Sequence, residues 1–359
     1  MAFSRVFLYN HHETADFTCP SDSLEDRTAM VSLYPLRFEP IYRHYLWGGR
    51  RLELLFDRQL ASQELYAESW EIVDHGGDQS VVQCGPLAGR TLHDLVEEYG
   101  ATLLGQPKPT SAMEQVAGRF PLLIKLLDAD QNLSMQVHPD DAMAARLDPP
   151  DLGKTEAWYV LATEPGGRIY AGLKPGVDRK ALAQAIQQGT CDECVHWFEP
   201  TPGDCLLIPA GTVHALGAGV MVAEIQQASD TTFRLFDWNR LGPDGKPRDL
   251  HVEQGLEAID FDAGPADPIC ISAAEKNMAA HLIECEYFSV SRWELDESVA
   301  LGGDGHCHVI IVLEGSARFD GDPAEDAVSR GRTILLPAAL PRVSIVPLGR
   351  TTLLDVRLP

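Results

Sequence analysis

The chain has 359 residues, more than the roughly 250–300 at which a single hydrophobic core stops growing, so we expect one large domain and one smaller one. Hydrophobic residues make up 45% and charged residues 23%, as in ordinary globular proteins, and no apolar run approaches the roughly 18 residues that span a membrane. The formal net charge of -24 argues against nucleic-acid binding, although a few basic residues in one cleft can still bind a small anion.

Three segments follow from the changes in composition along the chain. Residues 1–29 are polar and aperiodic, which predicts a poorly ordered tail. Residues 30–262 carry β-type runs interrupted by helical spacing and form the predicted large domain. The stretch Asp262-Ala-Gly-Pro-Ala-Asp-Pro is typical of a linker, so we expect the smaller domain to cover residues 263–359.

Helices are expected at three places within the large domain. Residues 90–119 show helical spacing of leucine and valine. Residues 178–198 again predict a helix, with Asp178 as its N-cap and Gly189 as its stop, and Asp249 can cap a short helix that runs through Ile259. The remaining apolar runs are short and bounded by Gly and Pro, which favours strands and a mainly β fold.

The smaller domain is expected to be a second β-sandwich. The phrase Gly203-x5-Pro209 is echoed by Gly331-x5-Pro337, so the two sandwiches are interpreted as copies of one motif. In the second copy His306, His308 and Glu314 imitate one half of a metal motif, but no closing histidine follows Pro337. We therefore predict a structural sandwich without a metal site.

The eight cysteines are scattered along the chain, which favours a reducing cytoplasm. Cys191 and Cys194 form a lone Cys-x-x-Cys with no second pair nearby, so free core thiols are expected rather than a zinc or redox site.

Four donors of the kind that bind metals converge in the large domain. Gln136 and His138 are two residues apart and face the same side of a strand, Glu156 lies in Lys154-Thr-Glu156, and a tight turn delivers His214. Two imidazoles, a carboxylate and an amide oxygen suit a divalent ion such as zinc, and four protein donors leave a coordination position open for catalysis.

These motifs together resemble a known enzyme family. Gly203-x5-Pro209-x-Gly211-x-x-His214 is similar to the second metal motif of cupins, although Ala218 stands where an Asn often follows. In combination with Gln136-Val-His138-Pro-Asp-Asp, Lys154-x-Glu156 and the stretch from Glu224 to Trp238, it resembles type I phosphomannose isomerase in its short bacterial form. The resemblance covers about residues 30–359 and includes Tyr45-Leu-Trp-Gly-Gly49 and Glu68-Ser-Trp-Glu71.

The resemblance implies a fold, a cofactor and a reaction. The fold is mainly β, with two cupin-type jelly-roll sandwiches and a helical insert in the N-terminal catalytic part. One Zn²⁺ per chain is bound by Gln136, His138, Glu156 and His214, and the enzyme interconverts mannose 6-phosphate and fructose 6-phosphate through an enediol. The expected protein is a cytoplasmic monomer or homodimer whose partner is a small phosphorylated sugar, with no nucleic acid and no membrane.

The same resemblance suggests roles around the metal. Arg234 and Lys154 are expected beside it as catalytic and substrate-binding residues, and Glu224 is the favoured general base, with Asp230 second. Ser134 and Lys125, both expected on the ligand strand, compete for the phosphate pocket, and we retain Ser134. Two alternatives stay open: an isomerase of another phosphorylated sugar, and a non-catalytic, metal-dependent sugar-binding protein.

Overall fold

The computed structural model describes residues 31–359, apart from residues 62, 107–117, 243–244 and 270–274. The predicted tail, residues 1–29, lies outside the described residues. Residues 33–359 form one compact unit, so the predicted boundary at residue 263 stays a prediction. The fold is mainly β, as predicted, and among the described helices none is both long and apolar enough to cross a bilayer.

Two sheets make up the first sandwich, and all of their strands end before residue 237. The six-stranded sheet has the order β1 (Ile41–Arg43), β2 (Glu68–Ile72), β5 (Leu122–Ala129), β12 (Val220–Gln227), β7 (Glu156–Thr163) and β10 (Cys205–Ile208). The five-stranded sheet has the order β13 (Phe233–Phe236), β6 (Met135–Val137), β11 (His214–Leu216), β8 (Ile169–Leu173) and β9 (Val195–Phe198). A small hairpin joins β3 (Asp74–His75) to β4 (Asp78–Gln79).

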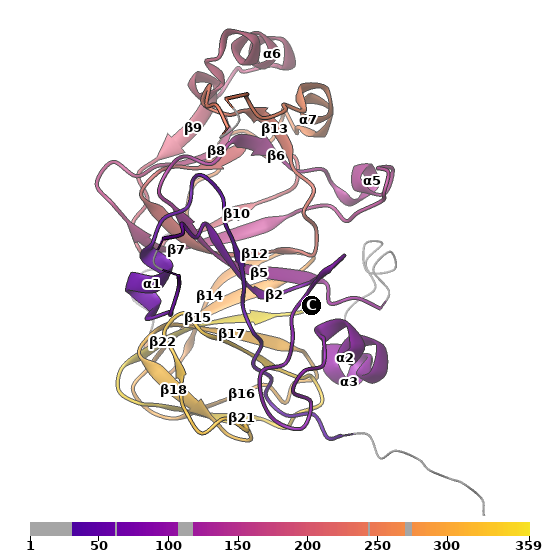
Figure 1. Cartoon of the computed structure of the whole chain (residues 1–359), viewed down its shortest axis with the longest axis vertical. Coiled ribbons are helices and arrows are strands. Elements are labelled where there is room, and N and C mark those ends of the chain that lie inside the picture. Colours follow the sequence, from indigo (N-terminus) through magenta and orange to yellow (C-terminus); the bar gives the residue numbers. More distant parts are fainter. Residues whose placement is uncertain (1–30, 62, 107–117, 243–244, 270–274) are drawn as a thin grey trace, which may run out of the picture. The chain divides into compact units, whose positions relative to one another are not determined.

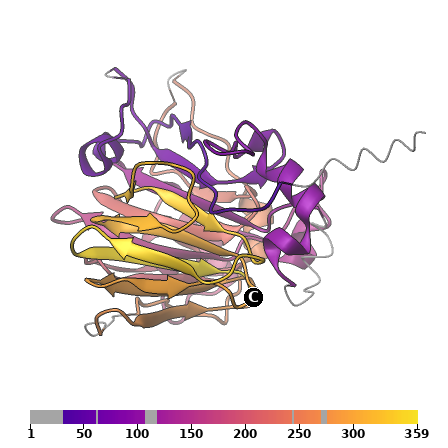
Figure 2. The ribbon, with the colours of Figure 1, turned by 90° about the horizontal axis from the view of Figure 1, so that it is seen from below.

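Two further sheets make up the second sandwich, whose strands all begin after residue 278 and are drawn in orange and yellow (Figure 2). One has the order β14 (Ala279–Glu284), β15 (Ser289–Leu295), β22 (Thr351–Arg357), β17 (His308–Glu314) and β20 (Thr333–Leu336). The other has the order β16 (Val299–Leu301), β21 (Val343–Pro347), β18 (Ser316–Phe319) and β19 (Val328–Ser329).

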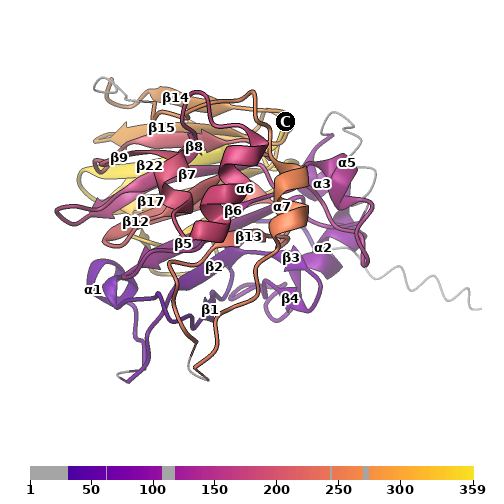
Figure 3. The same ribbon diagram turned by 90° about the horizontal axis from the view of Figure 1, so that it is seen from above.

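Among the described residues, the helices all lie before residue 259, in the part of the chain where a helical insert was predicted. They are α1 (Arg51–Phe56), α2 (Leu92–Tyr99), α3 (Ala101–Leu104), α5 (Asp141–Ala144), α6 (Arg179–Gln188), the 3-10 helix η1 (Cys191–Cys194) and α7 (Val252–Ala258). Helix α6 has the predicted caps: the Asp178 side chain accepts a hydrogen bond from the backbone of Ala181, and Gly189 ends the helix at a φ of 72°. Helices α6 and α7 lie on the outer face of the five-stranded sheet (Figure 3).

Two helix predictions need correction. Gly189 ends the helix as predicted, but the rest of the segment 178–198 is not α-helical, and residues 195–198 pair with β8 as strand β9. The helix before Ile259 has His251 and not Asp249 at its N-cap position, and the His251 side chain makes no capping hydrogen bond. The residues that lead into this helix run along β13, where the His251 amide donates to the Arg234 carbonyl at 2.7 Å. The helix therefore begins only after this contact.

The six-stranded sheet is buried on both faces, which explains its long apolar runs. One face of β5, β7 and β12 packs with β14, β15, β17 and β22 and with helices α1 to α3, which joins the two sandwiches through one core. The other face turns towards the five-stranded sheet. Figure 1 shows the sheets of the two sandwiches as successive layers. A polar residue on such a strand therefore costs free energy unless it faces a cavity or has a hydrogen-bonding or ionic partner.

The two sandwiches repeat one strand arrangement, which explains the echoed Gly-x5-Pro phrase. In the first, Glu156 begins β7 and pairs with Ile208 on β10, directly before Pro209. In the second, His308 begins β17 and pairs with Leu336 on β20, directly before Pro337. His308 therefore occupies the position equivalent to Glu156.

The same register extends to the central strands. Glu224 on β12 pairs with Lys125 on β5. Two residues after Glu224, Gln226 pairs with Glu156. Asp355 on β22 pairs with Ser291 on β15. Two residues after Asp355, Arg357 pairs with His308. Asp355 is therefore equivalent to Glu224, and Ser291 to Lys125.

Candidate metal centre

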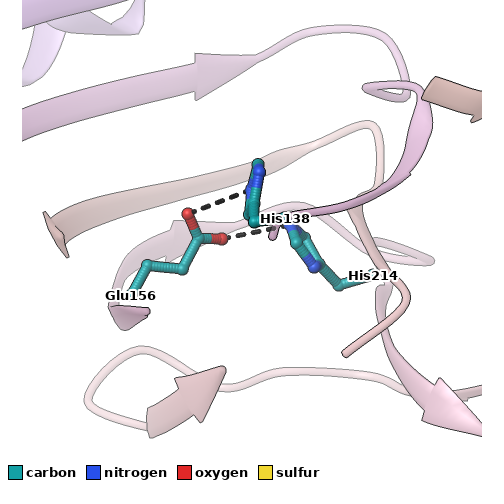
Figure 4. A group of neighbouring side chains, drawn as sticks. All are labelled: His138, Glu156 and His214. Carbon is teal, nitrogen blue, oxygen red and sulfur yellow. Dashed lines mark ion pairs between the residues drawn. The ribbon is translucent and has the colours of Figure 1, made fainter. Parts of the chain in front are cut away.

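Three buried side chains from different strands meet inside the first sandwich. His138 follows β6, Glu156 begins β7 and His214 begins β11, and their ligand atoms all lie within 4.8 Å of one another. Figure 4 shows the two imidazoles and the carboxylate turned towards a common point. Each of the three side chains is at most 1% exposed, so they meet in the interior and not on a solvated surface.

Backbone carbonyls fix the orientation of both imidazole rings. Nδ1 of His138 lies 2.9 Å from the Thr231 carbonyl oxygen, and Nδ1 of His214 lies 2.8 Å from that of Thr212. Because a carbonyl only accepts, each Nδ1 carries the proton, and a neutral ring then presents the lone pair of Nε2 to Glu156. Burial, assisted by Lys154, lowers the pKa of His138 to about 3, so this ring is neutral at ordinary pH.

Glu156 completes a site suited to a cation. Its Oε1 lies 3.1 Å from Nε2 of His214, and its Oε2 lies 3.5 Å from Nε2 of His138. Both oxygens are buried; Oε1 has no hydrogen bond from the described residues, whereas Oε2 lies 2.9 Å from the Lys154 ammonium. Burial would raise the pKa of Glu156, but Lys154 and the two histidines hold it well below its usual range. Lys154 supplies one cation to this group, but Oε1 still faces His214 Nε2 at 3.1 Å with no donor from the described residues, so the carboxylate and the two imidazoles fit a divalent metal.

Gln136 reaches the same group from β6. Its Nε2 lies 3.3 Å from Nε2 of His214, opposite which it pairs in the sheet. A half-turn of the amide exchanges its nitrogen and oxygen and places the oxygen beside His138, Glu156 and His214, which are called the metal group below. The structure thus brings together all four residues that were predicted as ligands.

A network behind His138 holds the carbonyl that orients it. Asp151 accepts hydrogen bonds from the hydroxyls of Thr231 at 2.7 Å and Ser229 at 2.9 Å, and it lies 3.1 Å from Nε2 of His75. Burial would raise the pKa of Asp151, but these bonds lower it to about 2, so the carboxylate stays ionised. Sequence reasoning missed Asp151, because nothing in the residues around it indicates a contact with Thr231, which lies 80 positions later in the chain.

A cavity of about 280 Å³ adjoins the metal group between the two sheets. It contains every residue predicted to be catalytic or to bind substrate. Its wall is formed by Tyr45, Trp47, Glu68, Lys125, Leu127, Leu133, Ser134, Gln136, Lys154, Glu224, Asp230, Thr232, Arg234 and Arg248. Lys154 links it to the metal group, with Nζ at 2.9 Å from Glu156 Oε2 and 3.2 Å from His138 Nε2.

Glu224 is the deeply buried carboxylate of this cavity. Its Oε2 accepts a hydrogen bond of 2.8 Å from Trp158 Nε1, and its Oε1 lies 3.5 Å from Lys125 Nζ. Burial, followed by repulsion from Glu156, raises the pKa of Glu224. Asp230 lies at the exposed part of the wall. Burial therefore distinguishes Glu224 from Asp230, whereas sequence spacing could not rank the two as candidates for the general base.

Arg234 faces the cavity from β13, as its strand position predicted. Nη1 donates to the Asp249 carbonyl at 2.8 Å, whereas Nε is buried without a hydrogen bond from the described residues. Burial and the neighbouring Arg248 lower the pKa of Arg234. Arg248 is itself held by Asp237, at 2.7 Å from Nε to Oδ2, and sequence reasoning missed it because it lies in an irregular segment.

Ser134 and Lys125 both line the cavity, but they do not share a strand. Ser134 directly precedes β6, and Lys125 lies on β5 in the opposite sheet, so the expectation of one ligand strand was wrong. Lys125 lies 3.6 Å from Glu68 and 3.5 Å from Glu224. Burial would lower the pKa of Lys125, but these carboxylates raise it above its ordinary value. Its charge is thus neutralised locally, which distinguishes it from Arg234.

The chain is similar to known proteins in both of its parts. Residues 36–157 match the family model for the catalytic domain of type I phosphomannose isomerase, and residues 278–354 match the model for the cupin domain of mannose-6-phosphate isomerase. The chain is 37% identical over 307 residues to a mannose-6-phosphate isomerase of Bacillus subtilis, covering 85% of this chain and 94% of the relative. It is 33% identical to the corresponding enzyme of Streptococcus mutans, over 84% of this chain and 92% of that one.

Among solved structures, the mannose 6-phosphate isomerase of Bacillus subtilis superposes with a TM-score of 0.78 and 30% identity. The match covers 90% of this chain and 99% of that one.

Proposed function

Because the chain belongs to the type I phosphomannose isomerase family, we propose that it interconverts mannose 6-phosphate and fructose 6-phosphate with one zinc ion per chain. The observation that carries the proposal is the meeting of His138, Glu156 and His214 beside a cavity with both acidic and basic walls. An aldose-ketose isomerisation needs both kinds of group, since it moves a proton and develops negative charge on oxygen.

Gln136, His138, Glu156 and His214 would hold the zinc ion. Two imidazoles with a carboxylate and an amide form a donor set that suits this borderline ion, and the cavity gives the substrate access to its remaining position. When bound, zinc supplies a Lewis acid that polarises the substrate's carbonyl and hydroxyl oxygens.

Glu224 is the proposed general base, which takes the proton from one carbon and returns it to the other through an enediol. It lines the cavity, and its raised pKa brings it closer to the pH at which a carboxyl group can both accept and donate a proton. Trp158 holds one carboxylate oxygen and leaves the other towards Lys125. Asp230, at the exposed part of the wall, is the second candidate.

Lys154 and Arg234 are proposed to stabilise the negative charges of the substrate. Lys154 Nζ lies beside the metal group, where the oxygens of carbons 1 and 2 must lie if they are to be polarised. Arg234 brings a buried Nε–H without a partner among the described residues, which can donate to a substrate oxygen. Ser134 can add a hydroxyl from the ligand side of the cavity.

The cell compartment and assembly belong to the same proposal. The six cysteines described as free thiols include Cys191 and Cys194, and they support a reducing cytoplasm. A monomer or homodimer stays the prediction for the oligomeric state.

The test is an assay of the purified protein with mannose 6-phosphate, before and after chelation and after zinc is restored. We expect fructose 6-phosphate to form only with metal, and about one zinc ion per chain by elemental analysis. A panel of other aldose phosphates decides the substrate, because faster turnover of a different sugar phosphate would replace the proposed one. Bound zinc without turnover of any panel member would favour a sugar-binding protein.

A further inference from the structure

The second sandwich contains a cavity of about 550 Å³ that the proposed reaction does not use. It lies between the two sheets of that sandwich, with β15, β17 and β22 on one side and β16 with the loop 302–304 on the other. Its size falls within the roughly 300–1,000 Å³ of sites for small molecules. The register places it where the first sandwich has its catalytic cavity, because His308 and Asp355 are equivalent to Glu156 and Glu224.

The floor of this C-terminal cavity is a buried charged group. Nδ1 of His308 lies 2.7 Å from Asp355, and Nε2 lies 3.1 Å from Asp304. Burial alone would lower the pKa of His308, but the two carboxylates raise it, since both ring nitrogens donate to them. Both aspartates are therefore engaged by one imidazolium, which leaves one negative charge at the floor.

The walls carry hydrogen-bond donors that the protein leaves unused. Trp293 Nε1 and Arg357 Nε are both buried, and neither has a hydrogen-bond partner within the described ranges. Buried donors of this kind cost about 1–3 kcal/mol each when nothing accepts from them. The hydroxyls of Ser289 and Ser291 line the same wall. The cavity therefore favours a ligand rich in acceptor oxygens.

The charge of the cavity lining favours an anion among ligands that are rich in acceptor oxygens. Arg342, Arg357 and the His308 imidazolium give three positive charges against two from Asp304 and Asp355, an excess of one in a chain of net charge -24. Arg357 has only a distant carboxylate, with Nη1 at 3.9 Å from Asp304. Two arginines in the lining of one cavity are donors that favour a phosphate group, and the serine hydroxyls can bond to the hydroxyls of a sugar.

We propose that the C-terminal cavity is a second, non-catalytic binding site for a small phosphorylated sugar. The phosphate is bound by Arg357 and Arg342 of the cavity lining, and sugar oxygens accept from Trp293 Nε1 and the serine hydroxyls. This site involves no metal and does not depend on the proposed reaction, because it shares no residue with the metal cavity.

The test counts binding sites by equilibrium dialysis of the zinc-loaded full chain against radiolabelled fructose 6-phosphate. We expect two molecules per chain for the wild type. Arg357→Gln is expected to weaken one of the two sites by about tenfold or more, since a charge-assisted bond is lost, while the rate of mannose 6-phosphate turnover is unchanged. Trp293→Phe, which removes the indole N–H and keeps an aromatic ring, weakens the same site.

The matched control is Arg234→Ala, which affects the other cavity. It removes the catalytic binding event and leaves the C-terminal one, so failure of one proposal is distinguishable from failure of the other. One site per chain, or two sites that neither Arg357→Gln nor Trp293→Phe alters in a protein of normal melting temperature, would overturn the inference. Equal competition by unphosphorylated fructose, or equal affinity for inorganic phosphate, would also contradict it.

Discussion

The two sandwiches share strand order and register, yet they present different chemistry at equivalent positions. In the first, Glu156 faces two imidazoles, and its Oε1 has no hydrogen bond from the described residues, so the group suits a metal cation in addition to Lys154. In the second, His308 stands at the equivalent place between Asp304 and Asp355, so carboxylates of the chain itself pair with this imidazole. One scaffold thus supports a metal group or an internal ion pair, depending on a few inward-facing residues.

The difference teaches where function lies in this fold. Both central sheets have apolar faces that join the sandwiches through one core, and these faces tolerate similar residues in both copies. The opposite faces differ in the type and balance of their charged groups. Changes at equivalent positions can therefore separate chemical roles from structural ones.

The largest effect is expected from His214→Ala compared with His308→Asn. Loss of a metal ligand should lower turnover of mannose 6-phosphate by roughly 10³-fold and reduce bound zinc, because the carboxylate and the remaining imidazole no longer enclose the ion. His308→Asn should leave zinc content and turnover close to wild type. Elemental analysis and initial rates decide this, and equal losses in both variants would break the comparison.

A second pair compares the central strands, Glu224→Gln with Asp355→Asn. The first should lower kcat by about 10²-fold or more with little change in melting temperature, as expected for loss of a general base. The second should keep kcat but cost roughly 1–3 kcal/mol of stability, because His308 loses its 2.7 Å partner in a buried place. Steady-state kinetics and thermal melts measure both; a kcat unaffected by Glu224→Gln would pass the role of base to Asp230.

Asp151→Ala tests the support of the metal group from behind. The carboxylate holds Thr231, whose carbonyl orients His138, so its loss should weaken zinc affinity by about 10–100-fold while the four ligands remain. Competition with a chromogenic chelator measures the affinity. Excess zinc should restore turnover, which separates this role from direct participation; turnover that zinc fails to rescue would argue against it.

The smallest effect concerns pH and has opposite signs in the two sandwiches. The pKa of His138 is about 3 in the folded chain, below its unfolded value near 6.5, so the metal-free protein should lose stability as pH falls from about 6.5 towards 3. The pKa of His308 is raised, so its contribution is present below about 6.5 and is lost as pH rises through the raised value.

Melting temperatures of the metal-free chain across this range check both signs. His138→Asn should flatten the acid decline, and His308→Asn should flatten the decline on the alkaline side. A His308→Asn profile that parallels the wild type would show that this ion pair does not contribute as described.

Much of the site was predictable because its residues lie in short local motifs. Gln136 lies on β6, His138 directly follows that strand and Glu156 begins β7, so short motifs in the sequence indicated three of the four predicted ligands. Helix α6 was equally local, since Asp178 and Gly189 cap it directly. The start of the helix before Ile259 failed, because a contact with β13 outweighs the capping preference of Asp249.

The sequence by itself determined the mainly β class, the four donors and the repetition of the sandwich, because these depend on residue type and on spacing along one strand or turn. Only the tertiary structure decided that Glu224 is the buried carboxylate and Asp230 the exposed one, that Lys125 faces Ser134 from the opposite sheet, and that His308 lies between two aspartates. Burial and charge at these positions arise from strands far apart in the chain, and no local pattern carries that information.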